Sequence, residues 1–289
     1  MAVTIVRVAE LYRTAAGRRD VQRWCEDQLD RWTIPHERRV IPTAAGETHL
    51  LAAGAGELTV LYLPGTNFNA ASSLSLVTAL AEHCRVVVAD LPGQPGLSDG
   101  ARPGGDRLAA YGRWADQVVA EVEGSRLVLV GHSLGAAVAL AATPGEPEAL
   151  LLVDPAGLIG LRVGASTLRA TLAWWARPTP ARSARLLDHM HAAGRHASEL
   201  HVEWMTLVAR HTRTAGAPGP LPADRVERWR KRPRTVLSGA QDCFLPVGPL
   251  AQAVRTRLGV ELTVLEDAGH LAPEEQPGAV VAAVAALAR

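Results

Sequence analysis

Short apolar runs alternate with longer amphipathic or alanine-rich segments along most of the chain. Residues 127–130 (Leu-Val-Leu-Val) have no polar position, which is typical of a strand that is buried on both faces of a parallel sheet. Six segments carry a strand pattern: 58–63, 85–90, 126–130, 149–153, 234–238 and 261–265. Two earlier segments, 37–41 and 48–52, favour an antiparallel hairpin at the edge of that sheet.

Helical patterns, with apolar positions three and four residues apart, lie between these strands. They cover residues 71–83, 106–123, 134–142, 247–258 and 277–288. One or two further helices are expected within residues 5–32, with Trp24 and Trp32 on apolar faces. Alternating strands and helices predict an α/β fold with a mostly parallel, doubly wound sheet, which binds ligands at the carboxyl ends of its strands.

The alternation stops between residues 156 and 233. This stretch has no strand pattern, contains Trp174 and Trp175, and ends in a loop rich in glycine and proline that begins at Thr214. A helical insertion between two strands of one sheet is most simply a lid over the sheet. We therefore expect a core made of residues 1–155 and 234–289, with residues 156–233 as a helical lid.

The strongest chemical signal is the pentapeptide 131–135 (Gly-His-Ser-Leu-Gly), between an apolar strand and a helix of small residues. This context is typical of a nucleophile elbow, a strained turn that lifts a serine hydroxyl above the sheet. Flanking glycines avoid clashes there, and the helix N-terminus favours developing negative charge. A second Gly-x-Ser-x-Gly copy around Ser98 lacks both the preceding strand and the following helix. Ser133 is therefore the predicted nucleophile.

Four motifs in register resemble those of the α/β-hydrolase family, and the resemblance covers nearly all of the chain. Besides the elbow, they are a glycine-rich turn at residues 90–98, an acid loop at 238–246 and a histidine loop at 267–270. The resemblance implies an α/β-hydrolase fold with a helical lid inserted between late strands. The layout is most similar to small bacterial carboxylesterases of the naproxen-ester type.

This resemblance assigns the catalytic roles to Ser133, Asp242 and His270, in the chain order that the family shows. His270 would take the proton of Ser133 as its hydroxyl attacks an acyl carbonyl, and Asp242 would orient the imidazole. Asp154 remains an alternative acid, because a minority of the family carries the acid after the corresponding strand. Its Asp-Pro-Ala-Gly context is also favourable for a simple turn.

The resemblance also implies an oxyanion hole made by the backbone N–H groups of Thr66 and Leu134. Pro64 stands where the family usually has a histidine, but backbone donors do not depend on that side chain. Asn67 and Phe68 are expected to line the substrate pocket, with the alternative that they only cap the next helix.

Composition narrows the class of protein. The 48% hydrophobic and 20% charged content fits a soluble globular chain, and 30 basic against 29 acidic residues provide no global field for nucleic acid. The three cysteines include no CxxC pair, and no nucleotide fingerprint follows the first strand, so we expect neither metal nor cofactor. No apolar run reaches the ~20 residues that span a bilayer, and no signal-peptide pattern opens the sequence. We expect a cytoplasmic protein without a membrane partner.

Charge is unevenly distributed along the chain. Residues 156–233 hold 13 basic and five acidic residues, whereas the rest holds 17 basic and 24 acidic ones. One interpretation is that the lid pairs with the acidic core. The other is that one basic cluster lines the approach to the cavity and attracts an anionic substrate, a phosphopantetheine arm or an acidic carrier protein; the cluster is Arg225, Arg228, Arg230, Lys231 and Arg232.

Three functions fit these observations. The favoured one is a serine hydrolase that acts through a covalent acyl-enzyme on a carboxylic ester of an apolar or aromatic acyl group. The first alternative is a thioesterase or acyltransferase that takes its acyl group from a carrier protein or a coenzyme A thioester. The second is a catalytically inactive scaffold that binds a ligand in the same cavity, against which the intact order of the three residues argues.

Overall fold

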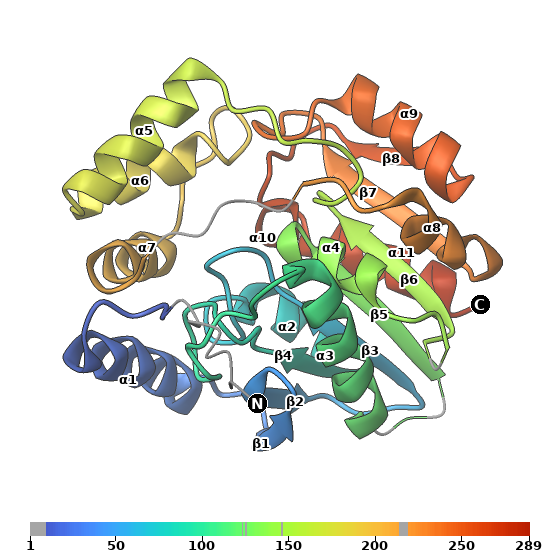
Figure 1. Ribbon diagram of the computed structural model, residues 1–289, viewed down its shortest axis with the longest axis horizontal. Helices are drawn as coiled ribbons and strands as arrows, with labels where there is room; N and C mark the ends of the chain where they lie inside the picture. Colours follow the sequence, from blue (N-terminus) through green and yellow to red (C-terminus); the bar gives the residue numbers. More distant parts are fainter. Residues whose placement is uncertain (1–9, 123, 125, 146, 214–218) are drawn as a thin grey trace, which may run out of the picture.

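A sheet of eight strands forms the middle layer of the part of the chain that the structure describes (Figure 1). The computed structural model describes all residues except 1–9, 123, 125, 146 and 214–218. The strands follow one another across the sheet in the order β1-β2-β4-β3-β5-β6-β7-β8. Their bounds are β1 His36–Thr43, β2 Gly46–Ala53, β3 Leu58–Leu63, β4 Arg85–Ala89, β5 Arg126–His132, β6 Ala149–Val153, β7 Arg234–Gly239 and β8 Leu262–Leu265.

The sheet is mostly parallel, as predicted. The hairpin β1–β2 is antiparallel and joins β4 in antiparallel register, whereas all other neighbouring strands pair in parallel. Every residue of β6 is buried, which agrees with its uninterrupted apolar sequence. Because β5 to β8 are parallel, the residues that follow them meet at one edge of the sheet.

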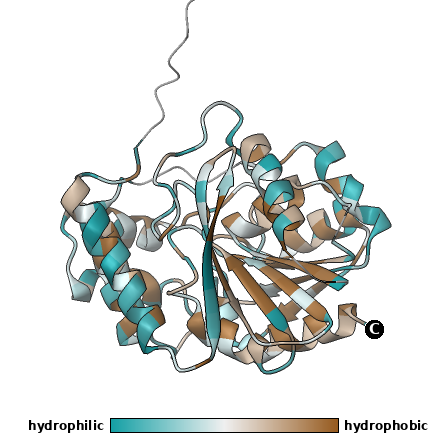
Figure 2. Cartoon of the chain, turned by 90° about the horizontal axis from the view of Figure 1, so that it is seen from below, coloured by the Kyte–Doolittle hydropathy of each residue, from teal (hydrophilic) through white to brown (hydrophobic). Residues whose placement is uncertain are grey.

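Helices cover both faces of this sheet. One apolar layer holds α3 (Arg107–Glu121), α4 (Leu134–Ala141), α8 (Ala223–Glu227) and α9 (Val247–Leu258). The opposite layer holds α2 (Leu74–Ala81), α10 (Ala272–Glu275) and α11 (Pro277–Leu287). Figure 2 shows hydrophobic residues concentrated along the strands between these layers. The predicted helices are present: α9 matches its predicted bounds, α4 and α11 are one residue shorter, and α3 and α2 are three and five residues shorter. The short helix α10 was not predicted.

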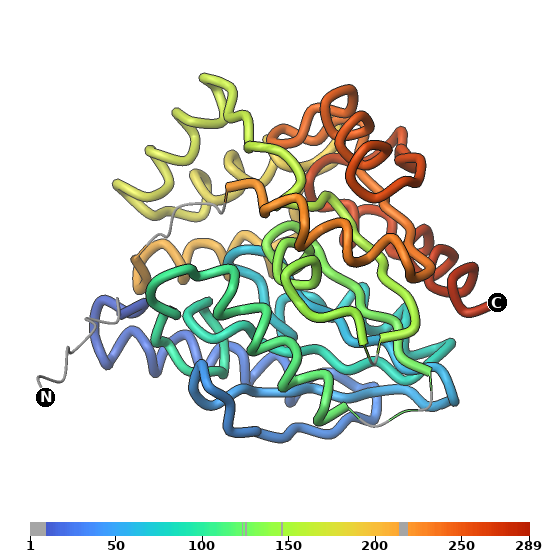
Figure 3. Tube along the Cα trace, turned by 45° about the vertical axis from the view of Figure 1, so that its right-hand side comes forward, coloured from blue at the N-terminus to red at the C-terminus, as the bar shows by residue number. Residues whose placement is uncertain are grey.

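Three lid helices pack together, and one of them, α7 (Glu199–His211), also packs against the leading helix α1 (Ala15–Arg31). The other two are α5 (Ala165–Ala176) and α6 (Pro180–Asp188), and Figure 3 shows α1 alongside α7. The rings of Trp24 and Trp204 lie 4.7 Å apart, which joins the two helices through apolar contact.

Trp32 lies one residue beyond the end of α1, as its C-cap, and its half-buried side chain packs against the apolar core. Its indole N–H donates to the Thr78 hydroxyl at 3.0 Å, which ties the end of α1 to α2. Residues 5–9 of the predicted leading helices lie outside the described part of the chain, and Ala15 is the first residue of the helix that is described.

The last part of the predicted lid packs in the core layer instead of with α5 to α7. The helix α8 and the short 3₁₀ helix η1 (Arg228–Lys231) contact α4 and α9. Val226 and Trp229 are fully buried there, and the indole N–H of Trp229 donates to the carbonyl of Leu140 at 3.3 Å. Burial of these two side chains accounts for the position of α8 and η1.

Three side chains of the basic cluster, those of Arg228, Arg230 and Arg232, bond to backbone carbonyls, and the prediction that the cluster lines the approach to the cavity stays a prediction. Arg228 donates to the Ala141 carbonyl at the end of α4, and Arg232 donates to the Gly145 carbonyl at 2.7 Å. Arg230 donates to the Arg257 carbonyl at the end of α9 at 3.1 Å. Helix C-termini leave carbonyl groups without partners, and these guanidinium groups satisfy some of them. The local excess of arginine therefore has a structural explanation.

Arg257 of α9 holds both ends of the insertion together. Its guanidinium donates to the carbonyls of Gly157 and Leu158 at 3.3 and 2.8 Å, and also to the carbonyl of Leu221. A direct backbone bond of 2.8 Å from Leu221 N–H to the Gly157 carbonyl lies beside it. One side chain thus closes the base of the lid.

We predict that Arg257→Ala lowers the free energy of unfolding by about 2 kcal/mol, because three carbonyls lose a charged donor. Arg255→Ala is the matched control on the same helix, since Arg255 pairs only with the exposed Glu261. Urea denaturation of the two variants and the wild type measures the difference. Equal stability of both variants would show that Arg257 does not hold the insertion.

Candidate active site

Ser133 occupies a strained turn between β5 and α4, with φ of 50° and ψ of −111°. The neighbouring glycines explain how the chain tolerates this turn. A Cβ at Gly135 would overlap the carbonyl of Leu63, and one at Gly131 would lie 2.6 Å from the backbone N of Ala136. Close packing of β3, β5 and α4 therefore holds the serine in a conformation that L residues rarely adopt.

His270 lies on the loop after β8, and its side chain contacts Ser133. Its Nε2 atom is 3.0 Å from the Ser133 Oγ, and its Nδ1 atom is 2.8 Å from Oδ2 of Asp242. Asp242 accepts, so Nδ1 carries the hydrogen and Nε2 is free to accept from the serine hydroxyl. The three predicted residues thus form one hydrogen-bond chain at the carboxyl edge of the sheet.

Asp154 lies beside this chain but bonds elsewhere. Its Oδ1 atom accepts from the Ser238 hydroxyl at 3.0 Å and from the Gly239 N–H at 2.9 Å. Its side chain is completely buried at the end of β6. Asp242 is therefore the carboxylate that bonds to His270, whereas Asp154 supports the end of β7.

Electrostatics separate the two carboxyl groups. Burial and the nearby charge of Asp242 raise the pKa of Asp154 well above its usual value. Burial acts in the same direction on Asp242, but His270 and the N–H groups of Phe244 and Leu245 outweigh it and lower the pKa of Asp242. Asp242 is therefore the ionised partner of the pair.

The pKa of His270 shows the effect of that ionised partner. Burial alone would lower the pKa of His270, but the charge and hydrogen bond of Asp242 outweigh burial and raise it. An imidazole with a raised pKa holds an incoming proton more readily. The site is thus prepared to accept a proton at Nε2, beside the Ser133 hydroxyl.

The loop that carries His270 is fixed by three contacts that the sequence did not predict. His270 N–H donates to the carbonyl of Met190 in the lid at 2.7 Å, and the ring of His132 lies 2.8 Å from the His270 carbonyl. The carboxylate of Glu275 accepts from Gly269 N–H at 2.7 Å and from Ala192 N–H at 2.8 Å. Glu275 thus joins the histidine loop to the lid.

The loop after β3 carries the predicted oxyanion-hole residue Thr66. Gly65 packs against the elbow, since a Cβ there would lie 3.3 Å from that of Ser133. Thr66 directly follows Gly65, and Leu134 directly follows Ser133 at the start of α4, so the oxyanion hole predicted from their N–H groups stays a prediction. Such a hole would provide two backbone donors to one developing oxyanion.

Asn67 and Phe68 anchor the same loop to its surroundings. Asn67 has a positive φ of 65°, donates its N–H to Gln94 at 3.0 Å, and accepts from the indole N–H of Trp204 at 2.7 Å. Phe68 is buried and meets the ring of His201 edge-on. The visible role of both residues is to hold the loop, and pocket lining stays a prediction.

Comparison with known proteins identifies the family. The model of the alpha/beta hydrolase family matches residues 60–284, which include all three members of the hydrogen-bond chain. The chain belongs to this family. A search of curated proteins finds no match to the sequence.

Solved structures share the fold of this hydrolase. Carboxylesterase CesB from Bacillus subtilis has a TM-score of 0.76 and 16% identity, over 95% of this chain and 99% of its own. Naproxen esterase from the same organism has a TM-score of 0.77 and 16% identity, over 96% and 100%. The 2-hydroxy-6-oxo-6-phenylhexa-2,4-dienoate hydrolase from Rhodococcus sp. strain RHA1 has a TM-score of 0.67 and 22% identity, over 89% and 100%.

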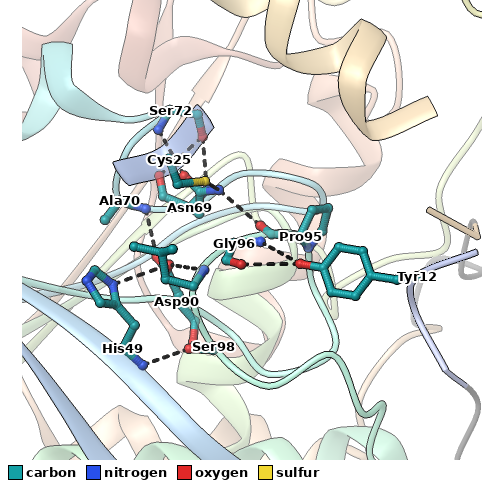
Figure 4. A network of polar contacts seen from close by, with 11 residues as sticks. Tyr12, Cys25, His49, Asn69, Ala70, Ser72, Asp90, Pro95, Gly96 and Ser98 are labelled. Atoms are coloured by element: carbon teal, nitrogen blue, oxygen red, sulfur yellow. Dashed lines mark hydrogen bonds and ion pairs between the residues drawn. The ribbon is translucent and has the colours of Figure 1, made fainter. Parts of the chain in front are cut away.

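A buried network around Asp90 explains the second Gly-x-Ser-x-Gly copy of the hydrolase (Figure 4). Ser98 donates its hydroxyl to the Asp90 carbonyl at 2.7 Å and accepts from His49 N–H at 2.8 Å. The Asp90 carboxylate accepts from Ala70 N–H at 2.8 Å and Leu97 N–H at 3.1 Å. Asp90 therefore anchors the loop after β3, and Ser98 has a structural role.

Ligand atoms of Asp154, Asp242 and His270 lie within 4.8 Å of one another, close enough to hold a metal ion. Their hydrogen bonds account for the cluster, because His270 Nδ1 bonds to Asp242 and one Asp154 oxygen bonds to the end of β7.

Among the described residues, no helix is both long and apolar enough to cross a membrane.

We predict that Asp242→Asn lowers kcat by about 10⁴, because the imidazole loses the partner that fixes its tautomer. Asp154→Asn is the matched control and should change kcat only slightly, since Asp154 does not contact His270 through a hydrogen bond. Steady-state kinetics on a chromogenic ester measure both variants. A larger loss in Asp154→Asn than in Asp242→Asn would assign the acid role to Asp154.

Proposed function

We propose that this hydrolase is a serine esterase that cleaves carboxylic esters of apolar or aromatic acids through a covalent acyl-enzyme. The hydrogen-bond chain from Ser133 through His270 to Asp242 carries the proposal. The serine lies at an elbow where a helix N-terminus and backbone N–H groups favour negative charge. This combination supports nucleophilic attack on an acyl carbonyl.

The residues divide the reaction into two similar steps. In the first, Ser133 Oγ attacks the carbonyl carbon while His270 Nε2 takes the hydroxyl proton, and the N–H groups of Thr66 and Leu134 stabilise the oxyanion. His270 then gives this proton to the leaving alcohol as the acyl–oxygen bond breaks. In the second step His270 takes a proton from a water molecule, whose oxygen attacks the acyl carbonyl. His270 then returns this proton to Ser133 Oγ as the acyl–serine bond breaks, which releases the acid and restores the serine hydroxyl.

The preference for an apolar acyl group is supported by the lid. Leu168, Leu172 and Trp175 are between 45% and 54% exposed, and their spacing places them on one face of α5. The lid therefore offers accessible apolar surface to a substrate. The names of two structural neighbours, a carboxylesterase and a naproxen esterase, agree with this substrate class.

The same acyl-enzyme could serve a thioesterase or acyltransferase, the first alternative from the sequence. Its main support was the basic cluster, and Arg228, Arg230 and Arg232 bond to backbone carbonyls instead. The ester is therefore the substrate that we propose. Assays with coenzyme A thioesters beside matched esters test this choice, and faster turnover of the thioester would contradict it.

Ser133→Ala should abolish ester turnover and labelling by a fluorophosphonate probe, because the attacking oxygen is missing. Ser98→Ala is the control, since it removes the serine of the second Gly-x-Ser-x-Gly copy, whose side chain is 1% exposed. We expect Ser98→Ala to keep labelling while melting at a lower temperature. Intact-protein mass spectrometry measures labelling. A labelled Ser133→Ala protein would disprove the nucleophile assignment.

A further inference from the structure

A cavity of about 450 Å³ lies outside the hydrogen-bond chain of the candidate active site. Its walls come from the start of α2, from lid residues 191–201 and from α10, and none of Ser133, Asp242 and His270 lines it. A volume of this size fits a small organic molecule. The cavity is therefore a candidate for a binding site that the proposed reaction does not use.

Glu274 is the unusual group in this cavity. Its side chain is only 9% exposed, and among the described residues no hydrogen bond reaches its carboxyl group. The Nε2 atom of His201 lies 3.8 Å from Oε2 of Glu274, beyond hydrogen-bond distance. That nitrogen is already 2.8 Å from the carbonyl of Ser72, to which it donates its hydrogen. Glu274 thus lines the cavity without a partner.

The other titratable groups around the cavity have partners of their own. His191 donates to the Leu187 carbonyl at 2.8 Å, and His196 lies 3.3 Å from the carboxylate of Asp188. Arg195 donates to the carbonyl of Glu275 at 3.1 Å and lies 3.9 Å from its carboxylate. Glu275 also accepts from two backbone N–H groups.

Burial shifts the pKa of Glu274 and of two side chains near it, His201 and Tyr62. Burial lowers the pKa of His201. Burial raises the pKa of Tyr62 on β3, and this tyrosine also interacts with Glu274. Both His201 and Tyr62 are therefore neutral near pH 7. Burial raises the pKa of Glu274 to about 8. A positive charge brought next to this carboxyl group would favour its ionised form.

We propose that this cavity binds a small organic cation, with a guanidinium or primary ammonium group on the Glu274 carboxylate and its apolar part against Leu74 and Leu200. Such a ligand supplies the donors that Glu274 lacks and covers the two leucines that line the cavity. A metal ion is less suitable, because the Nε2 atom of His201 is occupied by Ser72. This proposal does not rest on the proposed esterase reaction.

Isothermal titration calorimetry with butylguanidinium tests the proposal on the wild-type protein, with butylurea as the neutral probe of similar shape. Guanidinium stays charged throughout, so the pH dependence reports Glu274. Because the ligand binds the ionised carboxylate, affinity should rise about tenfold per pH unit below pH 8 and level off above it. Equal binding of butylurea, or no binding of butylguanidinium at pH 8.5, would overturn the proposal.

Two variants locate the site. Glu274→Gln should lose binding at least tenfold, whereas Glu203→Gln, at an exposed position on α7, should bind like the wild type. Ser75→Trp fills the cavity from an exposed lining position and should also abolish binding, which keeps the test valid if Glu274→Gln does not fold. Unchanged affinity in a folded Glu274→Gln or Ser75→Trp protein would overturn the proposal.

Discussion

The hydrogen bonds of the candidate site depend on the position of the loop that ends at His270. Imidazole has to meet the Ser133 hydroxyl and the Asp242 carboxylate at once, and small displacements break one of these bonds. Three parts of the chain hold this loop: the carbonyl of Met190 in the lid, the carboxylate of Glu275 in α10 and the ring of His132 at the end of β5. The lid is therefore part of the frame of the site as well as a cover.

Strain at the elbow places a second demand on the core. Ser133 is held at a positive φ, which costs of order 1–3 kcal/mol and persists only where packing enforces it. The glycines at 131 and 135 permit contacts between β3, β5 and α4 that any side chain would block. Gly65, which precedes Thr66 in the chain, packs against the same serine. The strained backbone and the oxyanion donor that we propose at Thr66 thus depend on one packing arrangement.

Much of the fold could be predicted because its signals are local. The segments 58–63, 149–153 and 247–258 match β3, β6 and α9 to the residue, since apolar runs and helical spacing do not depend on the rest of the chain. The prediction that Ser133 is the nucleophile also rests on local signals, because a strand, two glycines and a helix surround Ser133 in the sequence.

Other features depend on distant contacts and could not be predicted. Asp154 and Asp242 follow the carboxyl ends of the neighbouring strands β6 and β7. Only the three-dimensional structure shows that Asp242 is the one that bonds to His270. The sequence suggested that Arg228 and Arg230 of η1 were available to bind an anionic ligand. It carries no signal for the carbonyl groups at the ends of α4 and α9 to which these two side chains donate. Glu274 and Glu275 are adjacent in sequence and both side chains are buried, but backbone N–H groups from distant segments bond only to Glu275 among the described residues.

The most direct test of this account is the rate at which a fluorophosphonate labels Ser133 in Glu275→Gln. Glutamine can accept from only one of the two N–H groups that Glu275 holds, so the histidine loop should lose one anchor. We predict a fall of about tenfold or more in the second-order labelling rate, with Glu203→Gln unchanged. An unaltered labelling rate in a folded Glu275→Gln protein would contradict the claim that this clamp positions His270.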